Sequence, residues 1–161
     1  MKADKVMIFR IIRGACLVLL LIYVFSLFGH GKVSSAAYED VEKAVTAQVD
    51  TGLMLPAENR MIKRLYGLSA GDFEGITLYY PTTNMGAEEL LLVKLSDMSQ
   101  SETVEEAIRS RLAAQKKSFD GYGEAQTALL NASIIDVQGN YILFIVNENA
   151  QAIDEAFQAS L

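Results

Sequence analysis

The sequence predicts an α+β fold: an N-terminal transmembrane helix, then two helices and a ββαββα domain with a mainly antiparallel sheet. Three observations lead to this prediction. An uncharged apolar run lies near the start, short segments with alternating apolar residues occur later, and one long segment between them has apolar residues every three or four positions. Alternation is typical of strands, and the longer spacing is typical of amphipathic helices. We expect the helices to pack on a face of the sheet.

The first segment is a basic leader followed by an apolar run. Residues 14–29 carry no charge, and Ile11 and Ile12 can extend this run toward the length that a hydrocarbon core of about 30 Å requires. Because basic residues precede the run, the N-terminus should be cytoplasmic and the remainder outside. We therefore expect a single-pass protein of the cell membrane with an extracellular domain. A cleaved signal peptide with a small-residue site at 35–37 is the alternative.

These features divide the chain into three predicted parts. Residues 1–31 form the cytoplasmic leader and transmembrane anchor, or the signal peptide; residues 32–52 form a helical linker; residues 53–161 form the extracytoplasmic α+β domain. Val41 and Val45 stand four positions apart in the linker, which indicates a modest apolar face on a helix over 32–50.

A second short helix is predicted over residues 56–65. It begins with a proline, which is favoured in the first turn of a helix, and Gly67 can end it. Arg60, Lys63 and Arg64 make it the only basic cluster outside the leader. The cluster could contact an acidic partner or lipid headgroups, or it could simply be a solvated helix face.

The first predicted hairpin joins strands at residues 76–80 and 88–95 through turn residues at 81–86. In the second of these strands, Leu91 and Val93 point one way while Leu90 and Leu92 point the other, so both faces are apolar. This pattern is typical of a central strand that is covered on both sides.

The central helix follows this strand directly. Thr103 and Glu106 fit a capping box at its start, with Ser101 as a competing cap, and Gly121 can end it in a left-handed conformation. One stripe of the helix carries residues spaced by three or four: Val104, Ile108, Leu112, Gln115, Phe119 and Tyr122.

A second hairpin and a terminal helix complete the predicted domain. Strands at residues 132–137 and 141–147 flank Gly139-Asn140, a pair that suits a tight primed turn. The helix at 148–161 has Ile153 and Phe157 as its inward-facing residues.

Composition excludes several functions. Beyond residue 32, nine basic residues face nineteen acidic ones, a net charge of −10 that should repel nucleic acid. His30 is the only histidine and Cys16 the only cysteine, and both belong to the membrane region, so the domain cannot assemble cysteine–histidine, serine–histidine or zinc sites. No glycine-rich phosphate loop occurs. We therefore expect no enzyme, no catalytic residue, no cofactor and no metal.

Polar residues on the central helix mark the candidate site. Arg111 and Gln115 fall beside or within its apolar stripe, so they need partners, and Glu88 or Glu89 on the preceding strand could supply them. One interpretation is a structural ion pair. The other is a ligand-binding or interaction site that also includes Tyr122.

Tyrosines offer a second candidate surface. They could form the exposed aromatic patch that interfaces favour, or they could lie at the edge of the core. The residues concerned are Tyr79, Tyr80, Tyr122 and Tyr141.

From Met54 to Phe157 the chain resembles a family of uncharacterised extracytoplasmic domains of Gram-positive bacteria, domain of unknown function 4358. The strand EELLLVKLSD and the later GNYILFIV hairpin carry this resemblance, together with Arg111, Gln115, Phe119 and Tyr122. The resemblance implies a domain displayed outside the cell, and it implies no activity, because the family has none established. This chain departs from the family in lacking a lipobox, so a transmembrane helix would attach it to the membrane.

Two classes of function stay open. The first is a non-catalytic protein-interaction module of the bacterial cell envelope, which binds another envelope or membrane protein or a second copy of itself. The alternative is a small-ligand-binding or sensory domain with a polar pocket near Glu89, Arg111 and Gln115. A large exposed apolar patch would favour the first class, and a concave pocket lined by the tyrosines would favour the second.

Overall fold

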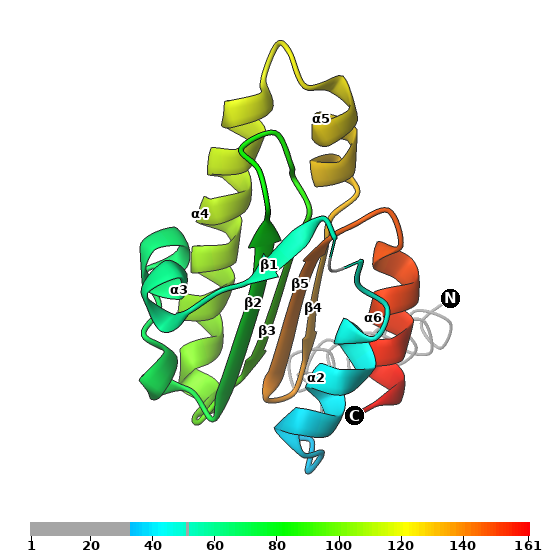
Figure 1. The fold of residues 1–161 in the computed structure, drawn as a ribbon. Helices are drawn as coiled ribbons and strands as arrows, with labels where there is room; N and C mark the ends of the chain where they lie inside the picture. The colour runs from blue at the N-terminus through cyan, green and yellow to red at the C-terminus, as the bar shows by residue number, and fades with distance from the viewer. Residues whose placement is uncertain (1–32, 51) are drawn as a thin grey trace, which may run out of the picture. The chain divides into compact units, whose positions relative to one another are not determined.

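A five-stranded antiparallel sheet with helices on both faces forms the body of the domain (Figure 1). The structure, a computed structural model, describes residues 33–50 and 52–161. The strands are β1 (Met54–Pro56), β2 (Gly75–Pro81), β3 (Glu89–Lys94), β4 (Ile134–Gln138) and β5 (Tyr141–Val146). The α-helices are α2 (Tyr38–Thr46), α3 (Asn59–Tyr66), α4 (Ser101–Phe119), α5 (Glu124–Asn131) and α6 (Ala150–Ala159). The predicted α+β class is confirmed.

The predicted membrane segment, residues 14–29, and the leader before it lie outside the described residues, as do Cys16 and His30. Within residues 33–50 and 52–161, no helix combines the length and the apolar character that a membrane crossing requires.

Strand β3 lies in the middle of the sheet, whose order is β1-β2-β3-β5-β4. All six of its residues are buried. Leu91 pairs with Leu78 of β2 on one side and with Phe144 of β5 on the other, and every neighbouring pair of strands is antiparallel. The prediction of a central strand that is covered on both faces is confirmed, because its two alternating sets of side chains enter two separate cores.

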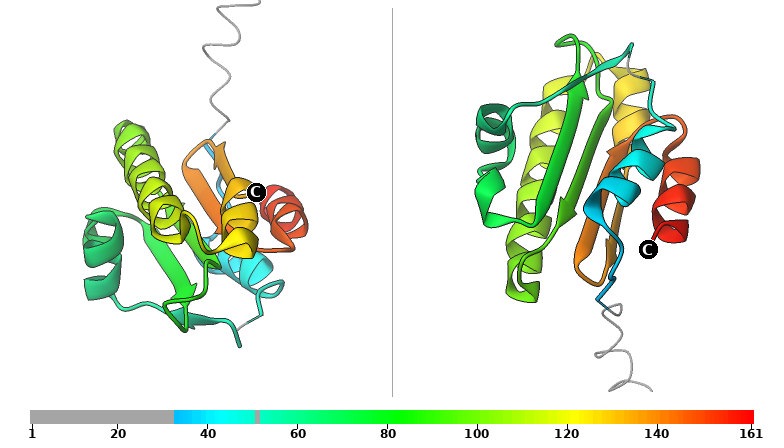
Figure 2. Two further views of the ribbon diagram at one scale, coloured as in Figure 1. Left: turned by 90° about the horizontal axis from the view of Figure 1, so that it is seen from above. Right: turned by 60° about the horizontal axis from the view of Figure 1, so that its bottom comes forward.

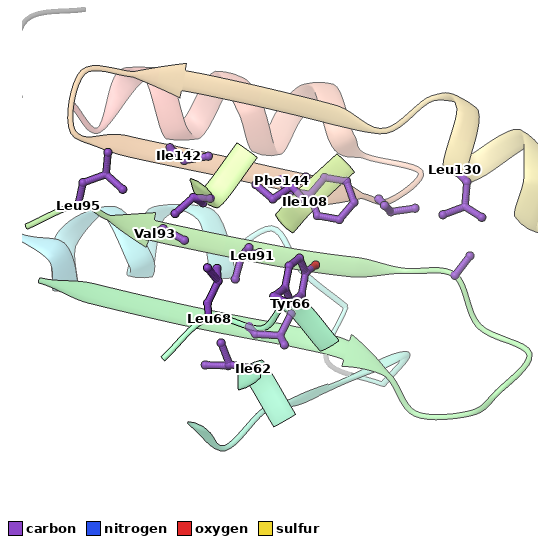
Figure 3. Packing of buried hydrophobic residues seen from close by; sticks show 14 of the residues in the cluster. Ile62, Tyr66, Leu68, Leu91, Val93, Leu95, Ile108, Leu130, Ile142 and Phe144 are labelled. Atoms are coloured by element: carbon purple, nitrogen blue, oxygen red, sulfur yellow. The ribbon is translucent and has the colours of Figure 1, made fainter. Parts of the chain in front are cut away.

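The first core lies between the sheet and the helices α3 and α4. Ile62 and Tyr66 of α3 and Ile108 of α4 pack against Leu91 and Phe144 of the two central strands (Figure 3). The apolar stripe of α4 is confirmed for Val104, Ile108, Gln115 and Phe119, which are buried. Tyr122 lies beyond the last turn of the helix and is exposed.

The second core lies on the opposite face, under α2 and α6 (Figure 2). Val41, Val45, Ile153 and Phe157 are fully buried there. They cover the other side chains of the central strands, which are Leu90, Leu92, Tyr141, Leu143 and Ile145. Helices therefore cover both faces of the sheet rather than one, because the two central strands are apolar on both sides.

Helix α2 lies in the segment that was predicted as a linker, yet it packs on the sheet. The Tyr38 hydroxyl donates to Thr77 Oγ1 at 2.7 Å, and the Tyr38 ring lies over Gly75 of β2. A side chain at position 75 would collide with that ring, so glycine is required for this close approach. The helix is shorter than predicted and begins at Tyr38.

The start of the second predicted helix was wrong. Residues Met54–Pro56 form β1, which pairs with β2 in the register Met54↔Pro81, and α3 begins only at Asn59. A proline is tolerated here because β1 is an edge strand, where a missing donor breaks no ladder bond on the open side. The end of the helix was correct: Gly67 has φ 72 in the left-handed region.

The predicted capping box of α4 was also wrong. A short 3₁₀ turn, Met98–Gln100, precedes the helix, so α4 begins at Ser101 and Thr103 lies inside its first turn. The capping box lies further upstream: Asp97 accepts from the Ser99 amide at 2.8 Å, and Gln100 Oε1 accepts from the Asp97 amide at 3.1 Å. Asp97 and Gln100 therefore form a capping box at the start of the 3₁₀ turn and not at the start of α4.

Helix α5 was not predicted. It has one buried residue, Leu130, so its apolar pattern is too weak to indicate a helix from sequence. The second hairpin and the terminal helix were predicted correctly in type, and Gly139 has φ 59 in the two-residue turn between β4 and β5. Because Asn140 has no positive φ, the turn follows the type II′ pattern.

Candidate functional site

A fully buried carboxylate, Glu89, is the centre of the candidate site. Arg111 Nη2 donates to its Oε2 at 2.7 Å and Arg111 Nε to its Oε1 at 3.0 Å, which makes a bidentate ion pair. Gln115 Nε2 donates to Oε2 at 2.8 Å, and the Tyr66 hydroxyl donates to Oε1. Both carboxylate oxygens therefore have strong donors, and the negative charge has a cation beside it.

The fold positions each of these side chains. Glu89 is the first residue of β3, and Tyr66 is the last residue of α3. Arg111 and Gln115 stand four residues apart on α4, so they project from the same face of the helix. Burial, together with the negative charge of Glu89, raises the pKa of Tyr66 well above its usual value. The tyrosine therefore stays protonated and acts as a donor.

Of the residues predicted for the site, the structure brings together Glu89, Arg111 and Gln115. Glu88 turns away: its Oε2 accepts from the Ala87 amide at 3.0 Å. Tyr122 is 63% exposed and contacts the ring of Phe119, with 6.1 Å between the ring centroids. Neither Glu88 nor Tyr122 joins the network.

Tyr66 belongs to the network but was not predicted. Its signal in the sequence was an aromatic residue with a hydroxyl on the apolar side of a short amphipathic helix, where the hydroxyl needs a buried partner. The proposed tyrosine patch does not form as one surface. Tyr141 is buried, Tyr79 packs against the second core, and Tyr80 lines a pocket.

A pocket of about 460 Å³ lies beside the network, bordered by α3, α4 and the connection from β2 to β3. Arg111, Gln115 and Arg64 line it, and no carboxylate from residues 33–50 or 52–161 does. Its other polar groups are those of Tyr80, Thr82, Thr83, Asn84 and Ser118. Its apolar side chains include Leu55, Met61, Leu65 and Phe119.

The guanidinium of Arg111 has donors to spare. An arginine has five N–H donors, and the bonds to Glu89 use the Nε donor and one of the Nη2 donors. Among the described residues, Nη1 of Arg111 makes no hydrogen bond, and Arg64 makes neither a side-chain hydrogen bond nor an ion pair. The pocket therefore has two arginines with N–H groups that are free to bind a ligand.

The arrangement holds a charge but offers no nucleophile with an adjacent base. The hydroxyl of Tyr66 is a buried donor, and Glu89 is occupied by three partners. In the described part of the chain, no group of three or more histidine, cysteine, aspartate or glutamate side chains could hold a metal ion.

A second buried carboxylate, Asp154, joins α6 to the edge of the sheet. Gln158 Nε2 donates to Asp154 Oδ2 at 3.0 Å and to Asp136 Oδ2 of β4 at 2.9 Å. Asp154 is 7% exposed, and its Oδ1 has no hydrogen-bond partner among the described residues. Burial, with the neighbouring charge of Asp136, raises the pKa of Asp154 to about 6.

Because this pKa lies above the ordinary value of 3.8, the folded chain binds the proton more tightly than the unfolded chain does. The stability that this group contributes is present below about pH 4 and is lost as the pH rises through about 6. Asp154→Asn should therefore raise the free energy of unfolding by about 1–2 kcal/mol at pH 7.5 and change it little at pH 4.5. Urea denaturation at both pH values checks this.

The matched control is Glu106→Gln, which removes an exposed carboxylate on α4. It should leave the stability within about 0.5 kcal/mol at either pH. Equal effects of Asp154→Asn at the two pH values would show that the charge of Asp154 does not change between them, and would contradict the assignment.

Fold and site together define an α+β domain with two cores on one antiparallel sheet, and with a charged network and a pocket beside the first core. The chain belongs to the family described as Domain of unknown function (DUF4358), whose model matches residues 47–147, more than half of the 161 residues. The resemblance stated from sequence is confirmed. Neither a curated protein nor a solved structure matches the chain.

The matched range omits part of the fold. Helix α2 ends at Thr46 and α6 begins at Ala150, so both helices that cover the second core lie outside residues 47–147. All residues of the Glu89 network lie inside that range.

Proposed function

We propose that this chain is a non-catalytic, membrane-anchored domain that binds a small ligand on the outer face of a cell. The observation that carries the proposal is the pocket of about 460 Å³ whose walls include Arg111, Gln115 and Tyr80. Small-molecule sites usually have volumes of about 300–1,000 Å³ and a few fixed polar groups. This pocket has the required size, and its polar groups come from three separate elements.

The buried network supports a binding role because it fixes one pocket wall. Glu89 holds Arg111 by two bonds and Gln115 by a third, so both side chains are restrained before any ligand arrives. Restrained side chains lose little rotamer entropy on binding, which favours affinity. The guanidinium of Arg111 is itself only partly buried, with 19% of its side chain exposed, so it remains accessible from the pocket.

Anchoring by residues 14–29, with a cytoplasmic N-terminus, is part of the same proposal. It rests on the uncharged run and the basic residues before it. Protease treatment of intact cells that express a C-terminally tagged chain checks it: the tag should be degraded while the protein stays in the membrane fraction. A tag that is protected in intact cells would contradict the orientation.

A protein-interaction module is the second candidate, with an envelope or membrane protein or a second copy of the chain as partner. Large apolar side chains that are exposed on β1 and on the nearby connections favour it. They are Leu53, Leu55, Met85 and Tyr122. Leu55 also lines the pocket, so a partner protein and a small ligand would compete for the same end of the domain.

A fragment screen separates the two candidates. We would use full-length protein in a non-ionic detergent and follow its thermal unfolding. Ser118→Trp should fill the pocket from the exposed last turns of α4 without touching Glu89, and Ser110→Trp is a matched change on the same helix outside the pocket. We expect fragments that stabilise the unmodified protein and the Ser110→Trp variant but not the Ser118→Trp variant.

A screen without any pocket-dependent binder would contradict the ligand-binding proposal. In-cell crosslinking then decides the second candidate. A recurrent envelope partner that is lost on Leu55→Asp and Met85→Asp would establish the interaction module instead.

A further inference from the structure

We infer that the pocket binds a ligand through a carboxylate group, with Arg64 and Arg111 as the anion-binding residues. The inference rests on the proposed function, since it names the chemical class of ligand for the same pocket.

The charge of the pocket is opposite to that of the domain around it. Beyond residue 32 the chain carries a net charge of −10, yet the charged side chains that line the pocket are two arginines. Glu89, behind the wall, neutralises one positive charge, so the pocket keeps about one net positive charge through Arg64. A monoanion is attracted to such a site, while the acidic surroundings disfavour a ligand with several negative charges.

The geometry of Arg111 also suits a carboxylate. Nε and Nη2 donate to Glu89, and Nη1 makes no hydrogen bond to any described residue. A guanidinium edge presents two parallel donors, which match the two oxygens of a carboxylate. The exposed arginine of α3, Arg64, lines the same pocket and can approach the same anion.

The position along α4 favours a carboxylate over a phosphate. Arg111, Gln115, Ser118 and Phe119 belong to the second half of a helix that ends at Phe119. Phosphate sites commonly use the free amides at a helix N-terminus, where the helix dipole is positive. No residue from the first turn of α4 lines this pocket, so the free amides of that helix start cannot bind a phosphate here.

The apolar walls indicate what the carboxylate is attached to. Leu55, Met61, Leu65 and Phe119 line the pocket together with the polar groups. A ligand with an apolar body and one carboxylate can pack its body against these apolar side chains while its carboxylate binds the arginines. Two sources offer this chemistry: a free small acid, or the carboxyl terminus of a peptide with an apolar last residue.

Isothermal titration of the full-length protein in non-ionic detergent tests the inference. The probes are 4-phenylbutyrate, its primary amide, the phosphonate 3-phenylpropylphosphonate, and an apolar tripeptide with a free or an amidated carboxyl terminus. We expect each carboxylate to bind at least about tenfold more tightly than its amide, since a charge-assisted pair is lost. The phosphonate should bind more weakly than 4-phenylbutyrate.

Arg64→Gln should weaken carboxylate binding by about tenfold without affecting the Glu89 network, which Arg64 does not contact. Arg109→Gln is the matched control: Arg109 is an exposed arginine of α4 that pairs with Glu105 and does not line the pocket. It should leave the binding unchanged.

The outcomes separate the two proposals. Amides that bind as tightly as carboxylates, a tighter phosphonate, or an unchanged affinity after Arg64→Gln would overturn the inference while the ligand-binding function stands. Loss of every probe and every fragment would overturn both. A free peptide terminus that binds more tightly than 4-phenylbutyrate would identify the peptide source; the reverse order would identify a small acid.

Discussion

Arg111→Met should lower the free energy of unfolding by about 3–5 kcal/mol at pH 7, because it leaves a buried carboxylate without its cation. Glu89 is fully buried, and Arg111 supplies three of its hydrogen bonds and its only ion pair among the described residues. Gln115 and Tyr66 would still donate to Glu89, but neither donor carries a charge. Urea denaturation followed by circular dichroism measures the loss.

Adding Glu89→Met to this variant should recover part of the lost stability. Replacing both members of a buried ion pair by apolar side chains is often neutral, whereas removing one member is costly. Recovery should be incomplete, since the Tyr66 hydroxyl and the Gln115 amide lose their acceptor. The non-additivity of the two changes is the direct measure of the coupling between the residues.

Glu88→Gln serves as the control for this pair of changes. Glu88 is adjacent in sequence, but it bonds to the Ala87 amide and not to Arg111. Its replacement should cost about 0.5–1 kcal/mol at most. A fully stable Arg111→Met protein would contradict the buried pair and would place Arg111 on the surface.

The partners of Arg111 were predictable from sequence for a physical reason. A long charged side chain within the apolar stripe of a helix needs a buried counter-charge, and the preceding strand began with two glutamates. The sequence could not decide between Glu88 and Glu89. The pairing of Leu91 with Leu78 and Phe144 fixes the sheet register, and that register turns Glu89 toward α4.

The central strand and the long helix were predicted well because many residues repeat the same period in each. Strand β1 and helix α5 were missed because tertiary contacts stabilise them more than their own sequence does. Residues Met54–Pro56 become a strand only by pairing with β2, and α5 contributes only Leu130 and the partly buried Leu129 to the first core. A polar pocket near Arg111 and Gln115 was one of the two interpretations from sequence, but its other walls were not predicted, since they extend from Leu55 to Phe119 in sequence.

Phe157→Ala should lower the free energy of unfolding by about 3–5 kcal/mol, since it removes a large, fully buried side chain from the second core. The Phe157 ring packs edge-on against Tyr141, with 6.5 Å between the ring centroids and 68° between the ring planes. Gln151→Ala is the matched control on α6, because Gln151 is exposed and bonds only to Glu155 of the same helix. It should cost about 0.5 kcal/mol or less.

The whole second core, and not only Phe157, depends on the helices α2 and α6. The matched range of the family, residues 47–147, contains the sheet, the Glu89 network and the helices of the first core, but not α2 or α6. Without those helices, Leu90, Leu92, Leu143 and Ile145 would lie on an uncovered apolar sheet face, which is a strong drive to aggregate.

A fragment limited to residues 47–147 should therefore fail to unfold cooperatively, while residues 33–161 should do so; thermal unfolding of the two fragments compares them. A cooperative transition in the shorter fragment would show that the second core is dispensable. The stability of the Glu89 network and of the pocket beside it would then depend on the first core alone. If the shorter fragment does not unfold cooperatively, the pocket depends on α2 and α6 on the other face of the sheet. The reason is that β3 carries Glu89 and contributes side chains to both cores.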